Sequence, residues 1–319
     1  MKKTIGTVIG VSVVIALIVM SIVFGKTSFT EQQLATLKIL LIVCGSSIAY
    51  CFIVGEITHN YSQMDKLWSL LPIAYLWIIA IRGGLSLRLL MYAFIGTVWG
   101  IRLTINFGRK GAYRLKFWEG NEDYRWSIVH SHPVFKHGFL WTLFNLFFIS
   151  TYQNLLVLAI CLPALACMGS TELLGIFDIV ATSLAFFFLI LETVSDEYQW
   201  KFHKEKNRML AEGKVLEELP APYDLGFNTT GPWGYMRHPN YLGEQGIWVS
   251  MYLFVLGAGA ANYGVFNITF VGPLLLVLLF MGSSMLGEKI SSGKYPRYED
   301  YTRQVHKYIP LKKFDTDKK

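Results

Sequence analysis

The chain has 319 residues, of which 53% are hydrophobic and only 16% are charged, and its formal net charge is +7. Soluble domains carry about 25% charged residues, and disordered chains lack this much apolar material, so a disordered chain is excluded and a soluble globule is disfavoured. The charged residues occur in groups with long uncharged stretches between them. This pattern is typical of a protein that crosses a membrane several times.

The first four membrane spans are predicted from uncharged stretches, because a bilayer core requires about 20 mostly apolar residues in a helix. The stretches are residues 4–25, 39–57, 67–81 and 85–106. A signal peptide is the alternative for the first of them, since two lysines precede an apolar run. That run is longer than usual for a signal peptide, and no Ala-x-Ala cleavage site follows. We therefore expect it to be a retained span.

The second half of the chain is divided by counting lysine and arginine. Residues 107–137 and 196–238 each contain six of them, and basic loops lie on the cytoplasmic side. An even number of spans must then separate the two loops. Residues 173–194 supply one span, so residues 138–171 supply one more with a kinked or interfacial part. Residues 245–287 are uncharged and interrupted by a glycine-rich segment, which predicts a helical hairpin.

These spans predict an all-α, polytopic membrane bundle of about eight transmembrane helices with both termini in the cytoplasm. Residues 1–64 would form N-terminal spans, and residues 65–319 a membrane domain with a cytosolic cofactor pocket. Most of the 29 Lys and Arg residues then lie on the cytoplasmic side. The basic charge needs no nucleic-acid partner and favours anionic lipids and anionic cofactors. The four cysteines lack metal-ligand spacing, so no metal site is expected.

Ionisable and polar residues occur together at the predicted cytoplasmic ends of the spans. Such groups are costly inside a membrane and are functional candidates by default, although charges also commonly end a helix. As a group they predict a polar pocket that admits a large anionic cosubstrate from water and a lipid-like partner from the bilayer. They are Glu56, His59, Arg102, Asn106, Glu192, Asp196, Glu244 and Glu288.

The densest motif is GPWGYMRHPNYLGE at residues 231–244. Pro239 predicts that a helix begins near Asn240, and a helix N-terminus beside Arg237 and His238 is a favourable anion site. Asn240 and Glu244 are four residues apart and share a helical face. The alternative is a capped helix start with basic side chains at the membrane interface.

This motif resembles the C-terminal membrane domain of steroid 5-alpha-reductases and isoprenylcysteine carboxyl methyltransferases. The chain is most similar to the bacterial, DUF1295-type branch of the steroid-reductase-like group, over about residues 65–310. Six further stretches carry the resemblance: residues 65–72, 100–104, 118–126, 196–202, 298–301 and 308–310.

The resemblance implies an NADPH-dependent oxidoreductase that reduces an activated C=C bond, an enone, in a lipid- or steroid-like substrate. It implies an NADPH pocket between the sixth, seventh and eighth spans. The cofactor-binding candidates are Asp196, Arg237, His238, Asn240, Tyr241, Glu244, Glu288 and Lys289.

The groups that would polarise the substrate carbonyl differ from those of the animal reductases, which use a Glu and a Tyr. Leu70 and Trp99 stand near those positions here. The nearest titratable replacements are Glu56, Tyr61 and Asp65, although Asp65 would alternatively cap the third span. Together with Trp99, these three are the candidate catalytic residues.

Two other functions fit the same scaffold. The methyltransferases use S-adenosylmethionine and usually carry paired glutamates near the end of the last span, whereas Glu288 is followed here by Lys289. A non-catalytic lipid-binding or assembly protein is the second alternative, and a transporter is disfavoured because no inverted repeat is visible. The start Met-Lys-Lys favours a bacterial inner membrane, with the site facing the cytoplasm, and the oligomeric state stays open.

Overall fold

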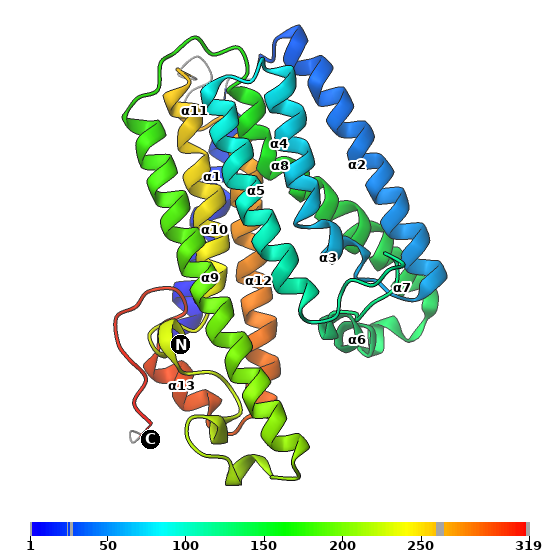
Figure 1. Cartoon of the computed structure of the whole chain (residues 1–319), viewed down its shortest axis with the longest axis vertical. Coiled ribbons are helices and arrows are strands. Elements are labelled where there is room, and N and C mark those ends of the chain that lie inside the picture. The colour runs from blue at the N-terminus through cyan, green and yellow to red at the C-terminus, as the bar shows by residue number, and fades with distance from the viewer. Residues whose placement is uncertain (1, 24, 26–27, 260–264, 317–319) are drawn as a thin grey trace. The chain divides into compact units, whose positions relative to one another are not determined.

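The computed structural model describes residues 2–23, 25, 28–259 and 265–316 (Figure 1). This part of the chain is helical and contains no β-strand, only an isolated parallel bridge between Met236 and His306. It divides into two compact units. Unit 1 comprises Met1–Thr182 and Met251–Leu276, and unit 2 comprises Ser183–Ser250 and Val277–Lys319. The predicted all-α fold is confirmed.

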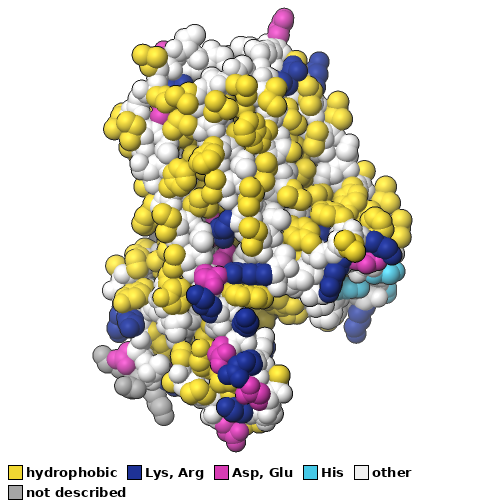
Figure 2. Space-filling model, viewed as in Figure 1, with side chains coloured by type: hydrophobic (Ala, Val, Ile, Leu, Met, Phe, Trp, Pro, Cys, Tyr) yellow, Lys and Arg dark blue, Asp and Glu magenta, His cyan; other side chains and the backbone are white. Residues whose placement is uncertain are grey.

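Five helical segments are long and apolar enough to cross a membrane, and two shorter apolar helices accompany them. Ile42, Ile57 and Phe94 on the long helices are 69%, 74% and 58% exposed, and Figure 2 shows hydrophobic side chains along the outward faces of the helices. So much exposed apolar area fits lipid rather than water. The chain is an integral membrane protein. The long segments are α2 (Glu31–Thr58), α5 (Leu87–Gly108), Gly138–Ala166, α9 (Ile176–Ala211) and Ile268–Lys294, and the shorter ones are Gly10–Val23 and α4 (Leu70–Arg82).

Unit 1 contains the N-terminal helices and most of the predicted spans. In it, α2, α4, α5 and α8 alternate in direction along the chain (Figure 1). The close approach of α4 and α5 requires glycine, because a Cβ at Gly100 would lie 2.5 Å from the Ser69 carbonyl oxygen. The remaining elements of the unit are α1 (Lys2–Val23), α3 (Gln63–Leu67), α6 (Tyr124–His130), η1 (Pro133–Lys136), α7 (Gly138–Phe144), η2 (Asn145–Tyr152), α8 (Gln153–Ala166), α11 (Leu253–Gly257) and η7 (Ile268–Phe270).

Some helix bounds coincide with the uncharged stretches, and others are set by local interactions such as helix capping. α2 begins at Glu31 rather than residue 39, because Thr30 and Gln33 form a capping box. The stretch 138–171 gives one helical segment, Gly138–Ala166, with Pro163 inside α8 and a π-helical turn at η2. The expectation of one irregular span there is confirmed.

A buried arginine joins several turns of unit 1. Arg88, near the start of α5, lies 2.6 Å from Asp178 through its Nε atom, and the two side chains are only 4% and 1% exposed. The Arg88 guanidinium also donates to the carbonyl oxygens of Glu172, Leu173 and Gly257. A Cβ at Gly257 would lie 2.7 Å from an Asp178 carboxylate oxygen, so this junction requires glycine.

Unit 2 is built on α9, α10 (Pro239–Met251) and α12 (Val271–Lys294). One end of each of these helices is assigned to unit 1. α10 begins at Pro239, as predicted. The sixth span was predicted to end at residue 194, and its helix, α9, continues past that residue to Ala211. Exposed ion pairs from Arg208 to Glu205 and Glu212 stabilise that polar extension.

Unit 2 also contains a small, mostly aromatic hydrophobic core, which is formed around three short 3-10 turns and one short helix. The turns and helix are η3 (Leu216–Glu218), η4 (Tyr223–Leu225), η5 (Gly231–Gly234) and α13 (Tyr298–Gln304). Their buried side chains are Leu225, Phe227, Tyr295, Tyr298, Tyr301, Val305 and Phe314. The predicted hairpin break falls partly on residues 260–264, which lie outside the described residues; on its first side, α10 is followed by α11 after an interruption at Tyr252.

Candidate functional site

The 231–244 motif is held in place by the C-terminal segment of unit 2. The backbone N–H of Arg237 donates to the carbonyl of His306 at 3.0 Å, and that of His238 donates to the carbonyl of Lys307 at 3.1 Å. These bonds accompany the Met236–His306 bridge. Residues 306 and 307 therefore lie alongside the motif just before α10 begins.

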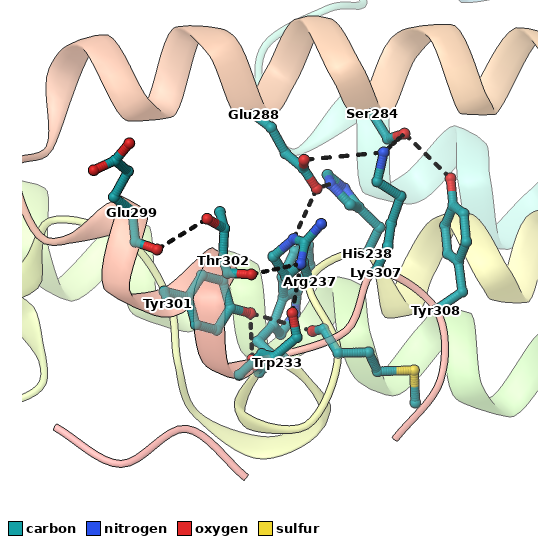
Figure 3. A network of polar contacts seen from close by, with 12 residues as sticks. Trp233, Arg237, His238, Ser284, Glu288, Glu299, Tyr301, Thr302, Lys307 and Tyr308 are labelled. Atoms are coloured by element: carbon teal, nitrogen blue, oxygen red, sulfur yellow. Dashed lines mark hydrogen bonds and ion pairs between the residues drawn. The ribbon is translucent and has the colours of Figure 1, made fainter. Parts of the chain in front are cut away.

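Three basic side chains converge on Glu288 of α12 (Figure 3). Arg237 Nε lies 2.8 Å from Glu288 Oε1, and His238 Nε2 lies 2.9 Å from the same atom. Lys307 Nζ lies 3.9 Å from Glu288 Oε2. The Glu288 side chain is 18% exposed and that of Arg237 is 8% exposed. The motif is thus joined to α12 through a largely buried ionic network.

The Arg237 guanidinium also binds the C-terminal end of α13. It donates to the carbonyl oxygens of Val305 and of Thr302, the latter at 3.3 Å. The Tyr301 hydroxyl donates to the carbonyl of Trp233 and, at 3.2 Å, to that of Met236 (Figure 3). Arg237 is therefore engaged with protein groups and holds the motif against the C-terminal segment.

Burial shifts the pKa values of two basic side chains in this network, His238 and Lys307. Burial lowers the pKa of His238, and the hydrogen bond to Glu288 opposes that effect only in part. Burial likewise lowers the pKa of Lys307. A neutral His238 must carry its proton on Nε2 in order to donate to Glu288. Its ring stacks on Tyr241, with centroids 5.2 Å apart and planes 17° apart.

A second polar group lies where α9 and α10 pack together. Asn240 Nδ2 donates to Asp196 Oδ1 at 3.2 Å, while Asn240 Oδ1 is buried and accepts no hydrogen bond from a described residue. Glu192, one turn before Asp196, and Glu244, one turn after Asn240, are each 3% exposed. The predicted common face of Asn240 and Glu244 therefore looks toward a buried, acidic part of α9.

Glycine makes this packing possible. A Cβ at Gly243 would lie 2.5 Å from the Cβ of Glu192, and one at Gly246 would lie 2.3 Å from the Phe188 ring. With the Asn240–Asp196 bond, these contacts run in opposite order along the two helices, so α9 and α10 are antiparallel here.

The structure brings together seven of the predicted cofactor residues in unit 2. Arg237, His238, Tyr241 and Glu288 belong to the ionic network, and Asp196, Asn240 and Glu244 to the α9–α10 group. Lys289 is exposed and lies outside both groups.

The ionic network also contains residues that sequence reasoning missed. Lys307 Nζ donates to Ser284 Oγ at 3.1 Å, and the Tyr308 hydroxyl contacts the same oxygen at 3.3 Å. The available signal was the 308–310 stretch, which Lys307 directly precedes.

The predicted catalytic residues lie in unit 1, and two of them contact α7. Glu56 accepts hydrogen bonds from Thr142 Oγ1 at 2.9 Å and from Asn145 Nδ2 at 2.8 Å. The Tyr61 ring packs edge-on against Trp141, with centroids 5.0 Å apart. Both side chains therefore lie beside the start of the 138–166 helical segment.

Asp65 packs against α6 and does not cap a helix, so the capping alternative is wrong. Its Oδ2 accepts a hydrogen bond from Trp126 Nε1 at 2.7 Å, and Arg125 lies 4.0 Å away. Burial raises the pKa of Asp65, and the Arg125 charge opposes that effect. The neighbouring Lys66 is fully buried and donates to the carbonyl oxygens of Phe117 and Glu119. The stretches 65–72 and 118–126 thus form one packed structure.

Trp99 has no exposed surface and is among the largest fully buried side chains of the protein. It lies in α5, in the core of unit 1. Among the described residues, no group of three or more His, Cys, Asp or Glu side chains is placed to hold a metal ion.

The fold and the site define a helical integral membrane protein with a buried ionic network at the start of α10. Residues 51–306 match the family described as "Protein of unknown function (DUF1295)", and the chain belongs to that family. It is also 35% identical, over 277 residues, to an uncharacterized protein of Schizosaccharomyces pombe, covering 81% of this chain and 77% of the yeast protein. No solved structure matches the chain.

Proposed function

We propose that this protein is an NADPH-dependent membrane reductase of an activated C=C bond in a lipid-like substrate. The observation that carries the proposal is the Asn240–Asp196 pair, in which the Asn240 amide is fixed by one hydrogen bond and keeps a buried acceptor unused. The resemblance of the 231–244 motif to the steroid-reductase-like group supports the same function.

The α9–α10 group fits a dinucleotide by its donors and acceptors. Asn240 Oδ1 is an unused acceptor for an N–H or O–H group, and a carboxylate such as Asp196 accepts from ribose hydroxyls. NADPH, when bound, supplies the hydride. Asn240 and Asp196 would orient it, and Glu244 would complete the group from the next turn of α10.

The ionic network has a supporting role in this proposal. Arg237 bonds to Glu288 and to backbone carbonyls, so it fixes the segment from which Asn240 projects. His238 bonds to Glu288 and stacks on Tyr241, and it orients the first turn of α10. The exposed Lys289 stays a candidate for a phosphate contact.

The group that polarises the substrate carbonyl would come from Glu56, Tyr61 or Asp65. Burial favours the protonated form of Asp65, and a protonated carboxyl can donate a hydrogen bond to a developing oxyanion. Trp126 donates to one Asp65 oxygen, and the other, 4.0 Å from Arg125, would make this donation. Trp99 would act through packing, because it is fully buried.

The membrane arrangement completes the proposal. Eight spans with both termini in the cytoplasm would turn the basic loops, and with them the cofactor site, toward the cytoplasm. We keep the bacterial inner membrane as the proposed location, and a eukaryotic organelle membrane is the alternative because a fission yeast protein is similar to this chain.

Calorimetric titration of the detergent-purified protein with NADPH, NADH and S-adenosylmethionine tests the function. The wild-type protein should bind NADPH, and Asn240→Ala should weaken that binding about tenfold, the effect of losing one buried hydrogen bond. The matched control is Asn145→Ala, which also removes an amide that donates to a carboxylate, Glu56. This control should leave NADPH affinity unchanged.

The other results assign the protein differently. Binding of S-adenosylmethionine alone would indicate the methyltransferase alternative. If none of the three compounds binds, a lipid-binding or assembly role becomes the better description. Equal NADPH affinity in the wild-type and Asn240→Ala proteins would refute the role of Asn240.

A further inference from the structure

The segment that joins α5 to the 138–166 helical segment lies at the end of membrane-spanning helices of unit 1. This joining segment, residues 109–137, starts directly after α5 and stops directly before α7. α2 ends beside it, because Asn60 Nδ2, two residues after that helix, donates to the Gly120 carbonyl at 2.9 Å. All three helical segments are long and apolar enough to cross a membrane, so the joining segment lies at one membrane face.

The joining segment and the first turn of α7 expose apolar and basic side chains close together. Leu115, Val134 and Phe139 are 108%, 54% and 71% exposed. Each of them has an exposed Lys or Arg within three residues along the chain. These apolar and basic residues are called the interfacial surface, and they are Arg114, Leu115, Lys116, Val134, Lys136 and Phe139.

The exposed leucine is held away from the protein by its neighbours. The Tyr113 hydroxyl donates to the Lys66 carbonyl at 2.9 Å, and the Lys66 ammonium donates to the Phe117 carbonyl at 3.0 Å. The rings of Tyr113 and Phe117 also pack together, with centroids 5.9 Å apart. Because both flanks are fixed, Leu115 presents its apolar surface to a phase outside the chain.

The joining segment is basic. It contains six Lys and Arg residues against three Asp and Glu, and neither Arg114 nor Lys136 has an ion-pair partner among the described residues. His130, His132 and His137 are exposed in the same segment. Near α6 and α7, Figure 2 shows histidine and Lys or Arg side chains directly below a hydrophobic cluster. Basic side chains next to exposed apolar ones are typical of protein surfaces that bind anionic lipid.

We propose that the interfacial surface binds anionic phospholipids of the membrane that the protein crosses. Its three apolar side chains enter the boundary of the acyl chains, and its three cations contact head-group phosphates. Lys116 lies 3.3 Å from Glu119, but both side chains are more than half exposed, so exchanging that pair for a phosphate costs little. A free phosphate ion would engage the cations alone, whereas a membrane engages both kinds of side chain.

The first test measures whether residue 115 enters the bilayer. The four native cysteines are buried, so a fluorescent label can be attached at Leu115→Cys in the full-length protein. After reconstitution into phosphatidylcholine vesicles with phosphatidylglycerol, and without NADPH, phospholipids carrying a doxyl group should quench this label. The control is a label at Lys214→Cys, because α9 extends about 25 Å beyond residue 194 before that turn. The control label should stay unquenched.

The second test measures the selection of lipid charge at the same label. Doxyl-phosphatidylglycerol should associate at least about fivefold more strongly than doxyl-phosphatidylcholine, the effect of one Lys or Arg near an anionic surface. Combining Arg114→Gln with Lys136→Gln should remove most of that preference. The matched control is Lys201→Gln, which removes a 75% exposed cation of α9 and should keep the preference.

Two results would overturn the proposal. A label at residue 115 that is quenched no more than the label at residue 214 would place the tip of the joining segment in water. Equal association of the two lipids, or a preference that survives the double replacement, would show that these cations do not select anionic lipid. Neither result bears on NADPH binding, so the proposed function would stand or fall separately.

Discussion

The bond between Arg237 and Glu288 gives the most direct test of the ionic network. Replacing Glu288 with leucine removes a carboxylate that lies 2.8 Å from Arg237 Nε and 2.9 Å from His238 Nε2. Breaking a buried ion pair on one side costs about 3–5 kcal/mol, because the other charge stays buried. Glu288 is 18% exposed, so water compensates part of this loss, and we expect about 3 kcal/mol.

Arg237→Met should cost more than Glu288→Leu, because it also removes the donors to the Val305 and Thr302 carbonyls. We expect about 4 kcal/mol for it. The double variant should cost about 4 kcal/mol rather than the sum, since the second change removes a charge that the first left unpaired. The coupling free energy is then about 3 kcal/mol.

Reversible unfolding in detergent micelles, followed by tryptophan fluorescence, measures these free energies. The control is Glu299→Leu, which removes a 70% exposed carboxylate paired with Arg303. Such an exposed pair contributes little, so the control should unfold like the wild type. A Glu288→Leu protein as stable as this control, or additive single and double variants, would contradict the reasoning.

Two further predictions concern the same unit. Gly243→Ala should destabilise the protein by about 2 kcal/mol, because the new Cβ would lie 2.5 Å from that of Glu192 and force α10 away from α9. The control is Gly282→Ala in α12, where a new Cβ meets open space, and it should be neutral or stabilising in the same fluorescence-detected unfolding assay. Because burial lowers the pKa of His238, the unfolded chain takes up a proton first as the pH falls below its reference value of about 6.5. Stability should therefore be complete above that pH and decrease below it, and melting curves from pH 8 to pH 5 should show a smaller decrease for His238→Gln; an identical pH dependence in both proteins would exclude His238 as the cause.

Much of the helical architecture could be predicted from the sequence, because bilayer depth requires uncharged stretches of a set length. Hydropathy does not report helix that continues into water. The residues of α9 that follow Asp196 are polar, and ion pairs such as Arg208–Glu205 extend the helix there. Capping chemistry likewise moved the start of α2 to Glu31.

The candidate site was predictable as a set of residues and not as a set of contacts. The 231–244 motif identified Arg237, His238 and Asn240, but their partners depend on chain segments far away in sequence. Glu288 is 51 residues from Arg237, and Lys307 enters the network through bonds to α12 and the adjacent backbone. Local patterns cannot specify such pairings.

The sequence also could not predict which buried polar atoms have hydrogen-bond partners. Asn154 stands out in the sequence only as a polar residue within an uncharged, mostly apolar stretch. The structure gives Asn154 a bond to its own helix and a longer contact with the Cys51 sulfur, and leaves its oxygen unpaired.

Arg88 has a consequence for the order in which the chain is assembled. Its ion-pair partner, Asp178, is 90 residues away, and its carbonyl partner at Gly257 is 169 residues away. During synthesis, α5 must therefore be inserted long before the acceptors of this guanidinium exist. The Arg88 charge has to wait in water or among head groups until residues 172–178 have been made, and its last acceptor follows only with residue 257. Closure of this junction is then a late step, and chains truncated before residue 257 should lack a finished unit 1.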